Sequence, residues 1–236
     1  MKDNNLSNGL IFCNVCWMEH YDDINKKEPP ARFGGGFVEQ HGYGYERNNF
    51  SVFTVTGKDG KTKKRVKGFF ETGHKNNQDE TRKRLDLGKI NPTFRNRDEI
   101  DHVLIIFCAK NPKTNKTCIV GWYDNALLID KPGDGYTESP NCYADAEDIC
   151  LLPINERTFE VPRSTANPLH FGFGQCNYWY ANEPQAQDFV NEVLDYIEKK
   201  QNNKYQHLRK IIFVDPVKID LNNIEKFKNE EDSKEE

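Results

Sequence analysis

The sequence lacks the features that would place it in a membrane or in several well-known enzyme classes. No stretch approaches the roughly 20 consecutive apolar residues that a helix needs to cross a bilayer, and residues 1–8 are too polar for a secretory leader. The glycines at 34–36 are not followed by the Lys-Ser/Thr of a phosphate-binding loop. Neither an HExxH zinc motif nor a G-x-S-x-G nucleophile elbow occurs. We therefore expect a cytoplasmic protein with no membrane partner, and we assign no catalytic residue.

Cysteine is present in an odd number, seven, which in a chain without a leader favours free thiols. Cys13 and Cys16 form the only C-x-x-C pair, and a tetrahedral zinc site would need two further ligands at a matching spacing. The pair lies inside a predicted strand, where side chains three residues apart point to opposite faces. We predict buried, inert thiols and no metal or other cofactor, with a zinc site or a redox pair as the alternatives.

Net charge is only −4, but the charge is unevenly distributed. Residues 57–97 hold thirteen lysines and arginines against five acidic residues, whereas the last seven residues are strongly acidic. Dense basic clusters neutralise phosphates without reading base sequence, although they also occur on plain solvated hairpins. We predict that the following side chains contact a nucleic-acid backbone: Lys61, Lys63, Lys64, Arg65, Lys67, Arg82, Lys83 and Arg84.

Many short β-rich segments, separated by compact turns, alternate with few helices. The expected strands lie at 10–17, 50–56, 66–71, 102–109, 117–123, 148–153, 159–162 and 210–215, with 117–123 returning antiparallel to 102–109 and residues 126–130 extending the sheet. Residues 28–49 are expected to form a long loop or a hairpin, and residues 184–200 show the 3.6-residue period of an amphipathic helix. The predicted fold is α+β, a mixed β-barrel with flanking helices. We expect one domain over 1–215, with a basic insertion around 57–97 and a polar, acidic tail over 216–236.

Three aromatic segments at or near predicted strand ends carry an asparagine within three positions of a tryptophan. The pairs are Asn14 with Trp17, Trp122 with Asn125, and Asn177 with Trp179. Rings can hold the faces of a flat ligand while amides bond to its edge, although each tryptophan could equally fill the core. We predict that a nucleobase is held by Asn14, Trp17, Met18, Trp122, Tyr123, Asn125, Asn177, Trp179 and Tyr180.

An ordered series of motifs over roughly residues 10–200 resembles a known block. The series is Phe12-Cys13-Asn14-x-x-Trp17-Met18-x-x-Tyr21, Gly34-Gly35-Gly36, Gly42-x-Gly44-x-Glu46-x-x-Asn49-Phe50, Val120-Gly121-Trp122-Tyr123-x-Asn125-Ala126, Leu151-Leu152-Pro153-x-x-x-Arg157-x-Phe159-x-Val161-Pro162-Arg163 and Gly174-Gln175-x-Asn177-x-Trp179-Tyr180-Ala181. It is similar to a block of bacterial proteins that stands alone or precedes an HNH endonuclease or another defence effector. The block also resembles the PUA superfamily, which includes the EVE, YTH and SRA domains.

This resemblance implies a PUA-like pseudo-barrel that takes a flipped or unpaired modified base, in DNA rather than RNA, into an aromatic cage. It also implies the specificity component of a modification-dependent restriction or defence system. No nuclease half follows residue 200 in this sequence, so cleavage would come from an effector nuclease acting in trans.

Two other functions remain open from the sequence. One is a metal-dependent nuclease with a dispersed site, whose candidate residues are His41, Glu46, Asp101, His102 and His170. The other is a protein-interaction module whose aromatic surface binds a peptide and whose affinity for nucleic acid is weak and insensitive to modification.

Overall fold

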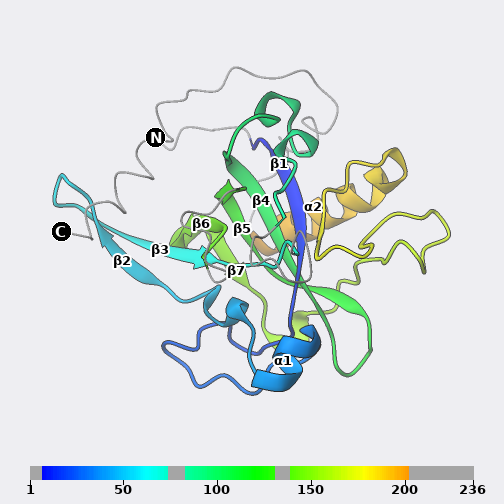
Figure 1. Ribbon diagram of the computed structural model, residues 1–236, viewed down its shortest axis with the longest axis horizontal. Helices are drawn as coiled ribbons and strands as arrows, with labels where there is room; N and C mark the ends of the chain where they lie inside the picture. Colours follow the sequence, from blue (N-terminus) through cyan, green and yellow to red (C-terminus); the bar gives the residue numbers. More distant parts are fainter. Residues whose placement is uncertain (1–6, 74–82, 131–138, 202–236) are drawn as a thin grey trace.

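A mixed sheet of eight strands forms the centre of the protein in the computed structural model, which describes residues 7–73, 83–130 and 139–201 (Figure 1). The strands are β1 (Gly9–Val15), β2 (Phe53–Thr56), β3 (Thr62–Gly68), β4 (Glu99–Lys110), β5 (Thr117–Ile129), β6 (Cys142–Asp145), β7 (Ile149–Leu151) and β8 (Tyr178–Trp179). The helices are α1 (Gly35–His41) and α2 (Gln187–Gln201), with short 3-10 turns that include η1 (Tyr45–Asn48) and η7 (Pro184–Ala186). The fold is therefore α+β, as predicted.

The strands follow the order β2-β3-β6-β5-β4-β1-β8, and β7 pairs with β5 beside β6. Strands β1 and β4 run parallel, and every other described pair is antiparallel. The pairing of β4 with β5 shifts register at three places, and such bulges bend a sheet. Strand β3 lies within this order, so the basic segment contributes directly to the sheet.

Each face of the sheet carries its own hydrophobic core, because successive side chains of a strand point to opposite faces. On β1, Ile11 and Cys13 belong to the core that also contains Val38 of α1, whereas Phe12 belongs to the other core. That other core is covered by the apolar stripe of α2, which consists of Val190, Val193, Leu194 and Ile197. The two α-helices therefore cover opposite faces.

Most of the predicted elements are present, with differences at glycine- and proline-rich segments. Residues 28–49 contain α1 and η1 instead of a hairpin; α1 ends at Gly42, whose φ of 76° suits glycine. The predicted strand at 159–162 is reduced to a bridge between Glu160 and Cys118. The helix predicted at 184–200 is formed by η7 and α2. The predicted strand at 210–215 and the acidic tail lie outside the described residues.

Across the described ranges, no helix is both long and apolar enough to cross a bilayer.

Candidate nucleic-acid interface

The three tryptophans are buried on two different faces of the sheet. Trp122 is 0% exposed and Trp179 is 5% exposed, and both belong to the core under α2. Trp17 is 8% exposed and belongs to the core on the other side. The sheet thus separates Trp17 from the other two rings, and a single cage built from all three tryptophans is wrong.

The burial of Trp122 and Trp179 follows from the strands that carry them. Trp122 lies in the middle of β5, paired with Ile106 of β4 and with Cys150 of β7, so it does not mark a strand end. Trp179 stacks on Phe12 with a centroid distance of 4.9 Å, and its indole N–H donates to the Glu183 carboxylate at 3.0 Å. Both rings already have protein neighbours where a base would have to stack.

The other predicted ring and thioether residues also have structural partners. Tyr123 is fully buried and meets Phe50 and Phe107 edge-on. Met18 is buried, and Tyr180 accepts a hydrogen bond from the Asp86 backbone N–H at 2.7 Å. Tyr180 is only partly exposed, so none of these three side chains presents a fully open face to a base.

The three predicted asparagines occupy two separate places. Asn14 and Asn177 meet at the end of β1, where the Asn14 backbone N–H donates to the Asn177 carbonyl at 2.6 Å. Asn125 lies apart from them on β5, in the left-handed region with φ 54°, and its side chain bonds to the His102 ring. Asparagine tolerates this backbone region well, which gives Asn125 a structural reason to occupy the bulge.

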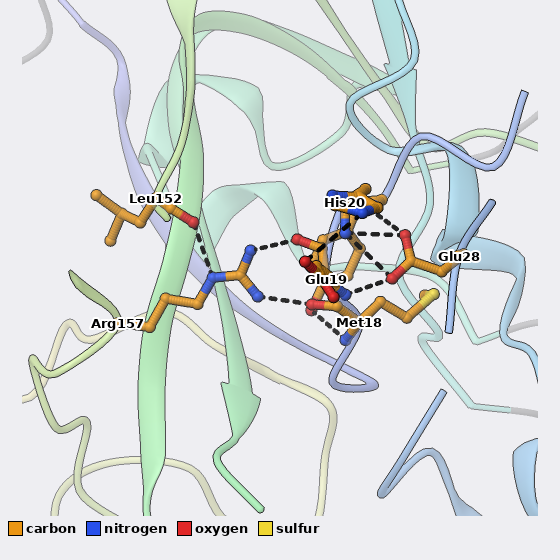
Figure 2. A network of polar contacts seen from close by, with 7 residues as sticks. Met18, Glu19, His20, Glu28, Leu152 and Arg157 are labelled. Carbon is orange, nitrogen blue, oxygen red and sulfur yellow. Dashed lines mark hydrogen bonds and ion pairs between the residues drawn. The ribbon is translucent and has the colours of Figure 1, made fainter. Parts of the chain in front are cut away.

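The loop that follows β1 is held from two sides (Figure 2). Arg157 is 1% exposed, and its guanidinium donates to the carbonyls of Leu152, Met18 and Glu19 at 2.9, 2.6 and 2.7 Å. On the opposite side, the Glu28 carboxylate accepts from the backbone N–H groups of residues 19–21. The Arg157 guanidinium also lies 5.2 Å from the Trp17 ring centroid. These contacts fix the loop and the indole that it carries.

A cluster of partly exposed rings lies around residues 37–45, a segment for which the sequence did not predict base binding. We call Phe37, His41, Tyr43, Tyr45 and Phe69 the aromatic cluster. Phe37 is 38% exposed, and its ring centroid lies 4.5 Å from His41, 4.9 Å from Tyr45 and 5.6 Å from Tyr43. The Tyr45 ring meets buried Phe69 at 5.5 Å, which joins the cluster to the end of β3.

A buried carboxyl group, that of Glu46, directly follows Tyr45 of the aromatic cluster on η1. Glu46 is buried, and the Cys16 thiol donates to its Oε2 at 3.5 Å. Burial raises the pKa of Glu46 above its ordinary value, and burial followed by the nearby Glu46 charge raises the pKa of the Cys16 thiol. Gly44 permits this arrangement, because a Cβ there would lie 2.0 Å from Glu46 Oε2.

The β2–β3 hairpin carries the exposed positive charge of the basic segment. We call its lysines the hairpin lysines: Lys58, Lys61, Lys63, Lys64 and Lys67. Successive strand residues face opposite sides, so Lys63 and Lys64 place charge on both faces of the hairpin. Lys67 lies over the Phe53 ring at 6.0 Å, and η1 packs against β3 at the base of the hairpin. The base of the hairpin therefore lies beside η1, which carries Tyr45 of the aromatic cluster.

Two arginines predicted to bind the nucleic-acid backbone are engaged within the protein instead. Arg65 is buried, 3.7 Å from the Asp145 carboxylate and 5.7 Å from the Tyr143 ring, so the prediction for it is wrong. Arg84 bonds to Asp130 and Asp98, each at 2.5 Å, which neutralises its charge locally. Lys83 is exposed, and Arg82 lies outside the described residues.

The residues of the alternative nuclease site do not converge in the described structure. Asp101 and His102 do meet, with His102 Nε2 3.3 Å from the Asp101 carboxylate, but the second ring nitrogen of His102 bonds to Asn125. His41 belongs to the aromatic cluster, Glu46 bonds to Cys16, and His170 is exposed elsewhere. His102 therefore contacts Asp101 and Asn125, and the other three candidates lie elsewhere.

The cysteines are free and mostly buried, as the sequence predicted, but Cys13 and Cys16 do not point to opposite faces. All seven are free, and five are buried: Cys13, Cys16, Cys108, Cys118 and Cys142. Burial raises the pKa of each of these thiols, which makes them poor nucleophiles. Cys13 and Cys16 do not face opposite sides, because β1 ends at Val15 and both thiols join the same core.

Only one group of carboxylates within the described ranges is close enough to share a cation: Asp145, Glu147 and Asp148. Buried Arg65 beside Asp145 already places positive charge there.

Comparison with known proteins adds no assignment, since no protein-family model, curated protein or solved structure matches this chain. The aromatic cluster is a feature that sequence reasoning missed. Its signal is an aromatic residue every two to four positions from Phe33 to Tyr45, within a segment whose glycines favoured a loop.

Proposed function

We propose that this protein is a nucleic-acid-binding module that recognises a modified base in DNA. The aromatic cluster replaces the tryptophan cage as the stacking surface, and the hairpin lysines hold the phosphate backbone. The observation that carries this proposal is the position of the cluster at the base of the hairpin: Phe69 directly follows β3, and its ring meets Tyr45 of η1, which packs against β3.

The aromatic cluster has the properties of a stacking surface. Phe37 is exposed although neighbouring rings surround it, and Tyr43 carries the Arg47 guanidinium 4.3 Å from its centroid. Base stacking on an aromatic ring contributes about 1–3 kcal/mol per base. An exposed ring beside an arginine can stack with a base while the arginine lies near a phosphate.

The hairpin lysines supply the electrostatic part of the affinity, which base stacking does not provide. Each lysine that neutralises a phosphate releases a condensed counterion, which strengthens binding at low salt without reading sequence. Selection of a modified base rests on the resemblance to PUA-like readers, and so does a role as the specificity component that works with an effector nuclease in trans. Bulges bend a sheet, so the register shifts between β4 and β5 support a curved, PUA-like barrel, and we extend the proposal to that fold.

Binding to short duplexes with a central cytosine, 5-methylcytosine or 5-hydroxymethylcytosine tests this proposal by fluorescence anisotropy across a salt series. The wild type should prefer one modified duplex. Lys63→Ala with Lys64→Ala should reduce the slope of log K against log salt by about 0.9 for each phosphate that is no longer neutralised. Lys199→Ala on α2, an exposed lysine over the opposite core, is the matched control.

The stacking surface has a test of its own. Phe37→Ala with Tyr43→Ala should weaken binding by about 1–3 kcal/mol and leave the salt slope unchanged, because no charge is removed. Leu169→Ala, which also truncates an exposed apolar side chain, should bind as the wild type does. Equal affinity for all three duplexes would reject the modified-base reader. Capture of a peptide without salt-dependent DNA binding would favour the protein-interaction module.

A further inference from the structure

Phe33 is an exposed aromatic residue in an unfavourable backbone conformation. Its φ is 61°, in the left-handed region that bulky residues seldom adopt, and its side chain is 44% exposed. Three glycines, which tolerate that region without strain, follow immediately at 34–36. The fold thus places a phenylalanine, with backbone strain and exposed apolar surface, where glycine would be accommodated without either. Strain of this kind collects at functional sites.

The backbone before Phe33 is anchored firmly. Arg32 and Trp17 form an antiparallel bridge, with N–H···O distances of 2.8 and 3.0 Å in the two directions. Trp17 is itself held by the Arg157 guanidinium, which lies 5.2 Å from its ring centroid. The buried network and the exposed ring are therefore connected through one short, hydrogen-bonded path. A side chain on such a support is presented in a fixed position.

A positive charge accompanies the ring. Lys110 ends β4, and its Nζ lies 4.9 Å from the Phe33 ring centroid. Arg32, which is exposed, is the next residue towards the N-terminus. An apolar wedge flanked by cations matches the chemistry of a step in a DNA duplex, in which stacked bases lie between two phosphate backbones.

We propose that Phe33 inserts between two neighbouring bases of duplex DNA, with Lys110 against the adjacent phosphate. This inference rests on the proposed function and adds to it a means of opening the stack. Removing a base from a helix requires unstacking, and an inserted ring offers the remaining bases a new stacking partner. The segment from Phe33 to Arg47 would then contribute both the wedge and the aromatic cluster.

A duplex with 2-aminopurine beside a central 5-methylcytosine, and its unmethylated twin, test the insertion, because 2-aminopurine fluorescence rises when the base unstacks. Wild-type protein should raise the fluorescence of at least one duplex at saturation. Phe33→Gly and Phe33→Ala should lose this rise and weaken binding by about fivefold to 150-fold, the equivalent of one stacked base. Phe33→Trp should retain both properties.

Phe33→Gly also separates function from folding, because glycine suits a φ of 61° and should leave the urea midpoint unchanged or higher. Leu169→Ala controls for the loss of an exposed apolar side chain. If Phe33→Gly binds as tightly as the wild type and keeps the fluorescence rise, the wedge is overturned while the proposed function stands. If the wild type binds neither duplex, or binds without dependence on Lys63 and Lys64, the proposed function fails and the wedge fails with it.

Discussion

Two aromatic-rich regions of this chain meet solvent in opposite ways. Trp122 and Trp179 are enclosed by the sheet and by α2, whereas Phe37 and His41 lie exposed on the short helix α1, and Tyr43 and Tyr45, which follow that helix, are partly uncovered. Both regions combine rings with polar neighbours in sequence. The difference lies in what covers them: one face of β5 lies under a 15-residue amphipathic helix, and the seven-residue α1 buries only Val38. Coverage by a second layer, rather than local composition, determines which rings meet solvent.

The largest expected effect is the difference in stability between the two regions. Trp122→Ala should lower the free energy of unfolding by about 3–5 kcal/mol, because it removes a fully enclosed ring and leaves a cavity. Phe37→Ala should cost less than about 1 kcal/mol, since part of that ring already meets water. Urea unfolding at equilibrium measures both values. Similar losses for the two variants would remove the distinction between core and surface.

The second comparison concerns two arginines that lie beside aromatic rings: Arg157, which is buried, and Arg47, which is partly exposed. Arg157→Met should lower the free energy of unfolding by about 1–3 kcal/mol or more, because the carbonyls of Met18 and Leu152 lose a donor in a buried place. Arg47→Met should cost less than about 1 kcal/mol, as its side chain is partly exposed beside Tyr43.

Hydrogen exchange sharpens this comparison. The backbone N–H of Trp17, which bonds to the Arg32 carbonyl, should exchange faster in Arg157→Met than in Arg47→Met. Unchanged protection at Trp17 would show that Arg157 does not support the path to Phe33.

Sequence periodicity was sufficient for elements whose burial is decided locally. The apolar run of β4, the antiparallel return in β5 and the 3.6-residue stripe of α2 were all predicted, because each pattern states which side faces a core. The free, buried cysteines were predicted from composition and spacing.

The placement of the aromatic and basic residues depended on pairing between distant segments, which local patterns do not contain. The sequence predicted a strand that ends at Tyr123 and a further extension of the sheet at 126–130, whereas β5 runs as one strand from Thr117 to Ile129 through a bulge. Arg65 stands within a basic run that indicated exposure, but its register against Asp145 on β6 buries it. Three successive glycines favoured a loop over α1, because glycine is a poor helix former. Since the helix was not predicted, the aromatic cluster that includes Phe37 and His41 was not predicted either.

The smallest expected effect concerns the buried carboxyl group of Glu46, which follows Tyr45 on η1. Burial is the main cause that raises the pKa of Glu46, and the charge of Glu71 adds to it. A carboxyl group whose pKa is higher in the folded state stabilises the fold fully below its unfolded pKa, and this contribution is lost as pH rises through the folded pKa. Glu46→Gln stays neutral and can still accept the bond from Cys16. The variant should therefore gain stability relative to the wild type as pH rises from 4, up to a plateau above the folded pKa.

Urea unfolding of both proteins from pH 4 to pH 8 gives this difference, and each unit of difference between the folded and unfolded pKa corresponds to about 1.36 kcal/mol. Glu39→Gln, on the exposed side of α1, controls for the loss of one negative charge near the cluster. Parallel pH profiles for wild type and Glu46→Gln would mean that Glu46 reaches water in solution. The comparison between the two aromatic regions would then change, because water behind Tyr45 would leave the cluster without a dry support. A rising difference instead means that the exposed rings rest on a layer as well enclosed as the one around Trp122, which is what a fixed stacking surface requires.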